Sequence, residues 1–206
     1  MKKIQLLLLV VLLTCNVMSL FAQVEKGKWF IAADGSCNFD IGKEKYEYGG
    51  TTTDNYKYFE FDFNPMGGYF VIDKLPIGLY FDVYSRSNKA SDDGDKYSET
   101  QFVVGPFARY YITDIKKLFP FVEGRVGFGT WHEKYTGGDT EKESYFSTRI
   151  GGGATYFFTQ NVGLDAFIGY DYDVWTSKAN ENEESDYKSK YGSVEINFGI
   201  VVTFGK

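Results

Sequence analysis

The sequence has little cysteine, histidine or proline, and each shortage narrows what the chain can be. Its 206 residues include two cysteines, and Cys15 lies in an N-terminal apolar segment, so Cys37 has no partner for an intramolecular disulfide. His132 is the one histidine available as a catalytic base. Only four prolines and weak helical periodicity, beside 19% aromatic residues and 23 glycines, favour a β-rich protein.

Positive charge is also scarce. The chain has 22 Lys and Arg against 28 Asp and Glu, a formal net charge of −6 at pH 7. This acidic balance argues against nucleic acid as a partner, because phosphate backbones are bound by clustered basic side chains. The apolar run Leu6–Leu13 is shorter than the ~20 residues that a membrane-spanning helix needs.

Residues 1–22 have the layout of a secretory signal peptide. Lys2 and Lys3 precede the apolar run, and the small residue Ala22 ends the segment. A lipoprotein interpretation of Cys15 is disfavoured, because Thr14 is a poor residue before a lipidated cysteine. We therefore expect an exported chain whose leader, cut within a residue or two of Ala22, is removed. Residues 23–206 then form one domain.

Alternation of apolar and polar residues recurs along that domain and predicts eight strands, most of them longer than the 5–6 residues usual in soluble proteins. The expected strands are 28–39, 57–72, 77–87, 98–112, 119–134, 143–158, 162–177 and 189–204. Short connections at 73–76, 113–118 and 159–161 alternate with longer polar ones at 40–56, 88–97, 135–142 and 178–188. This layout predicts an all-β fold, an eight-stranded antiparallel up-and-down transmembrane β-barrel.

The polar faces of these strands carry charge of both signs, and all four arginines of the chain fall there. The residues assigned to a charge network in the barrel interior are Asp34, Glu60, Asp62, Asp82, Arg86, Arg109, Glu123, Arg125, Arg149, Asp165, Asp171, Asp173 and Glu195. Lysine is absent from the middle of the strands. A narrow interior explains this pattern, because each charge there needs a partner and arginine makes paired contacts. The apolar faces would then meet lipid, where a charge costs ~2–4 kcal/mol.

A soluble, exported, lipocalin-like carrier of a hydrophobic ligand is the alternative with the faces reversed. Its outer face would carry lysine and glutamate along whole strands, which this sequence does not show. Aromatic residues near the short-turn ends favour the membrane, since such rings gather at the lipid–water boundary. The expected girdle consists of Trp29, Tyr69, Tyr110, Phe119, Tyr156, Phe158 and Phe204.

Three segments resemble small outer-membrane β-barrel proteins of Bacteroidetes-type bacteria, of the OmpX/OmpA barrel type. Residues 105–111 (GPFARYY) and 120–129 (PFVEGRVGFG) resemble the middle hairpin of that family, and 65–79 resembles its second periplasmic turn region. The resemblance covers residues 23–206. It implies the outer membrane of a Gram-negative cell, contact with outer-membrane lipid, and insertion by the barrel-assembly machinery.

That machinery recognises an alternating final strand that ends on an aromatic residue. The residues that match this signal are Val194, Ile196, Phe198, Ile200, Val202 and Phe204. Gly205 and Lys206 follow the aromatic, where the usual pattern of the family stops.

Eight strands enclose an interior that side chains can fill, which argues against a wide diffusive pore. The strand number does not exclude a narrow path for ions. A lipid-modifying enzyme is a second alternative, but alternation places His132 on the face of Val126 and Phe128, away from the charges. Asp171 and Asp173 match no calcium-loop spacing, and we expect no metal or cofactor. The expected function is structural, or surface interaction through four tyrosine-bearing loops that meet host or envelope ligands.

Overall fold

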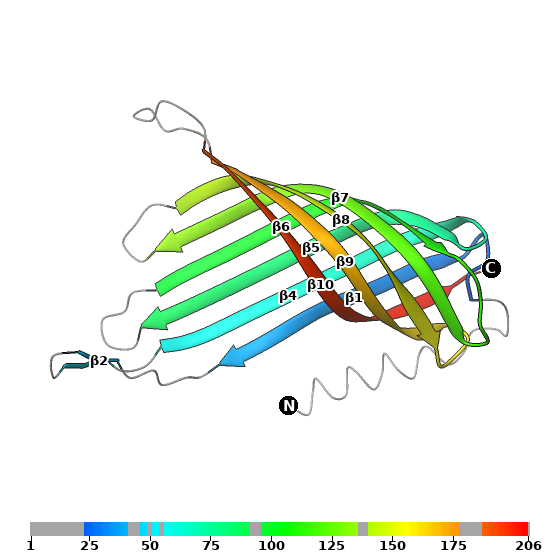
Figure 1. Cartoon of the computed structure of the whole chain (residues 1–206), viewed down its shortest axis with the longest axis horizontal. Helices are drawn as coiled ribbons and strands as arrows, with labels where there is room; N and C mark the ends of the chain where they lie inside the picture. Colours follow the sequence, from blue (N-terminus) through cyan, green and yellow to red (C-terminus); the bar gives the residue numbers. More distant parts are fainter. Residues whose placement is uncertain are drawn as a thin grey trace.

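The computed structural model describes residues 23–40, 46–48, 51–53, 56–90, 96–135, 140–177 and 187–205, and eight long strands in it close into one barrel (Figure 1). The barrel strands are β1 (Trp29–Asp40), β4 (Tyr56–Ile72), β5 (Leu75–Ala90), β6 (Lys96–Tyr111), β7 (Leu118–Tyr135), β8 (Thr140–Phe157), β9 (Val162–Ser177) and β10 (Tyr187–Phe204). Two short strands, β2 (Tyr46–Tyr48) and β3 (Thr51–Thr53), pair with each other inside a segment expected to be loop. The expected leader lies outside the described residues.

The topology confirms the predicted up-and-down barrel. Neighbouring strands along the barrel pair antiparallel, and β1 closes onto β10. The short connections lie together at one end of the barrel (Figure 1). In two of them a lysine adopts a positive φ, 69° at Lys74 and 61° at Lys116, which lets the chain reverse sharply. Within the described part of the chain, no helix is long and apolar enough to cross a membrane.

The apolar rows point out of the barrel. Phe198, Ile150 and Val194 are 71%, 70% and 69% exposed, while Arg109 on the opposite face of its strand is 1% exposed. Large apolar side chains with this exposure are stable only when something apolar covers them. The arrangement is the inverse of a soluble carrier barrel, whose apolar side chains line the interior. The soluble-carrier alternative is therefore wrong.

One residue of the expected aromatic girdle is misplaced. The other outward aromatic side chains of the girdle surround the short-turn end of the barrel, and each is 40–53% exposed: Trp29, Tyr69, Tyr110, Tyr156 and Phe158. Phe119 is buried instead, because it shares its strand face with the inward Phe121. Its ring packs edge-on against Phe157, with the centroids 5.2 Å apart. Phe204 is partly buried on β10.

Aromatic side chains fill the half of the barrel nearest the short turns. The buried aromatic side chains in and next to this half of the barrel are Phe30, Phe70, Phe107, Tyr111, Phe119, Phe121, Phe157 and Phe167. Glycines make room for them: a Cβ on Gly153 would lie 2.8 Å from Cζ of Phe121. Residues before β1 cover the same end, where the Lys74 amide donates to the carbonyl oxygen of the buried Val24 at 2.7 Å.

The barrel wall has an incomplete seam between β1 and β10. Residues Trp29–Asp34 pair with Phe204–Gly199, and beyond them no pairing of the two strands is formed among the described residues. β1 stays paired with β4 up to Asp40, and β10 stays paired with β9 over 187–202. Figure 1 shows β1 and β10 diverging toward the end opposite the short turns.

Candidate functional site in the barrel interior

A buried ion-pair network crosses the lumen at the inner edge of the aromatic packing. Arg109 on β6 donates from Nε to Glu123 on β7 at 2.6 Å and from Nη1 to Asp165 on β9 at 2.5 Å. Arg125 donates from Nε to the second oxygen of Glu123 at 2.7 Å and contacts Asp34 on β1 at 3.4 Å. The network thus joins four strands, and it satisfies charges that would be costly in isolation.

Rings and hydroxyls complete the surroundings of Arg109. Its guanidinium carbon lies 3.8 Å from the centroid of Phe121 and 5.1 Å from that of Phe30, which are cation–π distances. Thr155 donates to the remaining oxygen of Asp165 at 2.5 Å. We call this network, with the buried rings beside it, the interior plug: Asp34, Arg109, Glu123, Arg125 and Asp165, with Phe30, Phe107, Tyr111 and Phe121.

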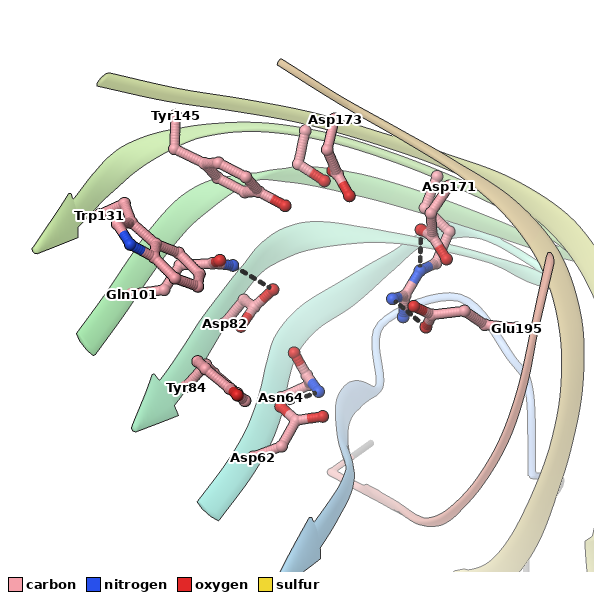
Figure 2. A pocket seen from close by; sticks show the side chains of 12 residues that line it. Asp62, Asn64, Asp82, Tyr84, Gln101, Trp131, Tyr145, Asp171, Asp173 and Glu195 are labelled. Atoms are coloured by element: carbon pink, nitrogen blue, oxygen red, sulfur yellow. Dashed lines mark hydrogen bonds and ion pairs between the residues drawn. The ribbon is translucent and has the colours of Figure 1, made fainter. Parts of the chain in front are cut away.

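Beyond the plug, toward the long-loop end, the lumen widens into a cavity of about 250 Å³. Figure 2 shows the side chains that line it. The lining residues, here named the acidic cavity, are Asp62, Asn64, Asp82, Tyr84, Gln101, Trp131, Tyr145, Ser147, Arg149, Asp171, Asp173 and Glu195. They come from every barrel strand except β1, so the cavity borders the incomplete seam.

Arg149 is the cation of the acidic cavity, and its guanidinium is already paired with two carboxylates. Its Nε donates to Asp171, and its Nη2 lies 2.9 Å from Glu195 (Figure 2). The Glu195 side chain is 42% exposed, against 4% for Asp171, because β10 is not paired with β1 at this height. Asn64 donates to Asp62 at 2.9 Å and Gln101 to Asp82 at 3.3 Å, both neutral donors.

Aromatic rings form the wall of the cavity nearest the long loops. Trp131 stacks on Tyr84 with centroids 5.9 Å apart and planes 20° apart. Trp175 meets Trp131 edge-on at 6.5 Å and Tyr145 at 5.1 Å. In Figure 2 the rings of Trp131, Tyr84 and Tyr145 stand on one side of the cavity, and the side chains of Asp171 and Glu195 stand on the other.

The remaining charges of the expected network lie further toward the long loops. Glu60 and Arg86 are register partners on β4 and β5, and Glu60 accepts a hydrogen bond from Tyr84 at 3.3 Å. His132, the one candidate base, sits between Thr100 and Lys142 in the strand register. Its side chain has no hydrogen bond to another residue in the described ranges.

Sequence reasoning missed the neutral side chains of both groups. Tyr111 and Thr155 in the plug, and Trp131 and Gln101 in the cavity, were not singled out. Alternation was the signal available for them, since Tyr111 lies two residues from Arg109 and so shares its face. The grouping across the lumen had no such signal, because strand alternation gives no information on which strands oppose each other.

Comparison with known proteins identifies a family and a relative. A family model described as the OprF membrane domain matches residues 29–201. Outer membrane porin F of Pseudomonas fluorescens is 29% identical over 152 residues, which are 71% of this chain and 44% of that protein. The chain therefore matches less than half the length of this relative.

Two solved structures share the fold. The NMR structure of Escherichia coli outer membrane protein W has a TM-score of 0.51 at 14% identity, covering 87% of this chain and 99% of that one. Ail, the attachment invasion locus protein of Yersinia pestis, solved with the heparin analogue sucrose octasulfate, has a TM-score of 0.50 at 16% identity and the same coverage.

Proposed function

The chain belongs to the OprF membrane-domain family, an outer-membrane β-barrel of Gram-negative bacteria, and from this premise we propose that it is a closed barrel with a structural or surface-interaction role. The observation that carries the proposal is the interior plug. Arg109, Phe107 and Phe121 are each at most 2% exposed, so side chains fill the lumen where a pore would have to pass. An eight-stranded barrel has room for little else.

The role then falls to the surface at the long-loop end. The connecting segments there lie largely outside the described residues. In the orientation usual for such barrels, short turns face the periplasm and longer loops face outward. We propose that these loops meet host or envelope ligands. We do not propose a sulfated ligand like that of Ail for this chain, because its net charge of −6 disfavours the binding of polyanions.

We propose no catalytic activity. Among the residues that the structure describes, His132 lies between Thr100 and Lys142 and forms no hydrogen-bonded nucleophile–base pair of the kind that acyl transfer needs. We further propose a Bacteroidetes-type source, from the segment resemblance, and insertion by the barrel-assembly machinery through the alternating residues of β10.

A planar-bilayer recording on the purified protein tests the closed barrel. We expect no stepwise current from the wild type, because the plug blocks the lumen. The double variant Phe107→Ala/Phe121→Ala removes two plug rings and should produce conductance steps. Phe128→Ala is the matched control, since that ring is 66% exposed on the outer face, and it should stay silent. Stepwise current from the wild type would overturn the proposal.

A further inference from the structure

The acidic cavity has a charge imbalance that its own residues do not relieve. Five carboxyl groups line it, from Asp62, Asp82, Asp171, Asp173 and Glu195, against the single guanidinium of Arg149. Arg149 is engaged by Asp171 and Glu195. Among the described residues, no ion pair reaches the other three aspartates. Their hydrogen-bond partners are neutral side chains, which leave the excess negative charge in place to attract cations.

Two aspartates among the cavity-lining residues each have one buried carboxylate oxygen without a hydrogen-bond partner. Asp171 is 3% exposed and lines the cavity, yet its Oδ2 has no hydrogen-bond partner. Oδ1 of Asp173, two residues along the same face of β9, is also buried without a partner. Such atoms are rare in folded proteins and call for an explanation such as a bound ligand.

The placement of the carboxylates argues for an extended cation. They stand on four strands, Asp62 on β4, Asp82 on β5, Asp173 on β9 and Glu195 on β10. In the described ranges, no three acidic, cysteine or histidine side chains converge as a metal ion requires. Calcium takes six to eight oxygen ligands at one point. Separated carboxylates instead match several ammonium groups spaced along one molecule.

The aromatic wall favours an organic cation over a hydrated metal ion. The rings of Trp131, Tyr84 and Tyr145 stand opposite the side chains of Asp171 and Glu195 (Figure 2). Aromatic faces attract ammonium groups and bury the methylenes between them. The volume of about 250 Å³ equals roughly eight water molecules at ~30 Å³ each, enough for a small flexible amine.

We propose that the acidic cavity binds a linear aliphatic polyamine, with its ammonium groups on the carboxylates and its methylenes against Trp131 and Tyr145. The ligand enters from the long-loop end, because the plug closes the opposite side. The inference does not depend on the closed pore: a conducting barrel could still hold a polyamine in this cavity.

Calorimetric titration of the folded full chain in non-ionic detergent, with spermidine as the probe, tests the proposal. Spermidine should bind at least about tenfold more tightly than propylamine, since it engages several carboxylates at once. The double variant Asp82→Asn/Asp173→Asn should weaken spermidine binding at least about tenfold. Asp114→Asn is the matched control: its side chain is 66% exposed at the short-turn end, and binding should be unchanged.

Three results would overturn the polyamine site. They are equal spermidine affinity in the wild type and the double variant, equal affinity for spermidine and propylamine, and displacement of spermidine by an equal concentration of MgCl₂. The last would assign the cavity to divalent cations. The comparison of the three probes on the wild type needs no substitution, so it decides the matter even if the double variant does not fold.

Discussion

Arg109 neutralises two of the buried carboxylates of the interior plug. It is 1% exposed, pairs with both Glu123 and Asp165, and lies against the ring of Phe121. A buried ion pair adds little net stability compared with apolar packing, but removing one partner leaves the other charged and buried. The stability of the plug therefore depends on every one of its charges keeping a partner.

Substitution of Arg109 tests this dependence. Arg109→Ala should lower the free energy of unfolding by about 3–5 kcal/mol, because it strands Glu123 and Asp165. The triple variant Arg109→Met/Glu123→Gln/Asp165→Asn should recover part of that loss. Urea unfolding in detergent micelles, followed by tryptophan fluorescence, measures both, with the exposed Lys134→Ala as control. An unfolding midpoint for Arg109→Ala equal to the wild type would contradict the account.

At the scale of elements, the β1–β10 seam is the weak joint of the wall. The two strands share pairs from Trp29–Phe204 to Asp34–Gly199 and then separate. Unpaired backbone groups at a strand edge invite another strand or water. The seam leaves Glu195 half-exposed, so it also shapes one side of the acidic cavity.

Cysteine cross-linking measures how far the seam is closed. Continuing the β1–β10 register would bring Ile196 opposite Cys37, but the strands have separated there. Ile196→Cys, with the native Cys37, should therefore cross-link poorly under mild oxidation. The pair Ala33→Cys/Ile200→Cys, in a Cys37→Ser background, spans registered partners and should cross-link readily. Equal yields would mean that the seam is closed in the membrane.

The elements also show where reading the sequence succeeds and where it fails. Each of the eight expected strands is present, because alternation over a dozen or more residues is a strong signal. Phe119 was assigned to the outer girdle from its place near a turn. It lies two residues from the inward Phe121, therefore on the same face of the strand, and it is buried. Parity was the better guide, since each strand residue faces the side opposite to its neighbour.

At the scale of the whole molecule, the eight long strands close into one barrel. Every barrel strand pairs with a neighbour on both sides, and β1 meets β10 over Trp29–Asp34 near the short-turn end. The barrel has no free edge where β1 and β10 pair, and we expect it to stay folded in mild SDS until it is boiled. Its folded state can therefore be followed by electrophoretic mobility.

Boiled and unboiled membrane fractions, compared on a gel in mild SDS, test folding and assembly together. We expect the unboiled wild type to migrate differently from the boiled protein and to lie in the outer-membrane fraction. Phe204→Ala should reduce the amount of the folded form, because the assembly machinery is proposed to recognise that aromatic. Val71→Ala, an outward residue of β4, is the control and should assemble normally. Equal folded amounts for Phe204→Ala and the wild type would refute the assembly role.

The sequence by itself determined the strands, the barrel and the face on which each charge lies. These follow from local chemistry: a period of two residues, lysine-free strand centres, and connections that alternate in length. The tertiary structure alone decided that Arg109 pairs with Asp165 across the lumen, and that Asp62, Asp82 and Asp173 surround one cavity with Trp131. The physical reason is that alternation fixes the side of the wall, whereas strand tilt and register fix which residues meet across the lumen.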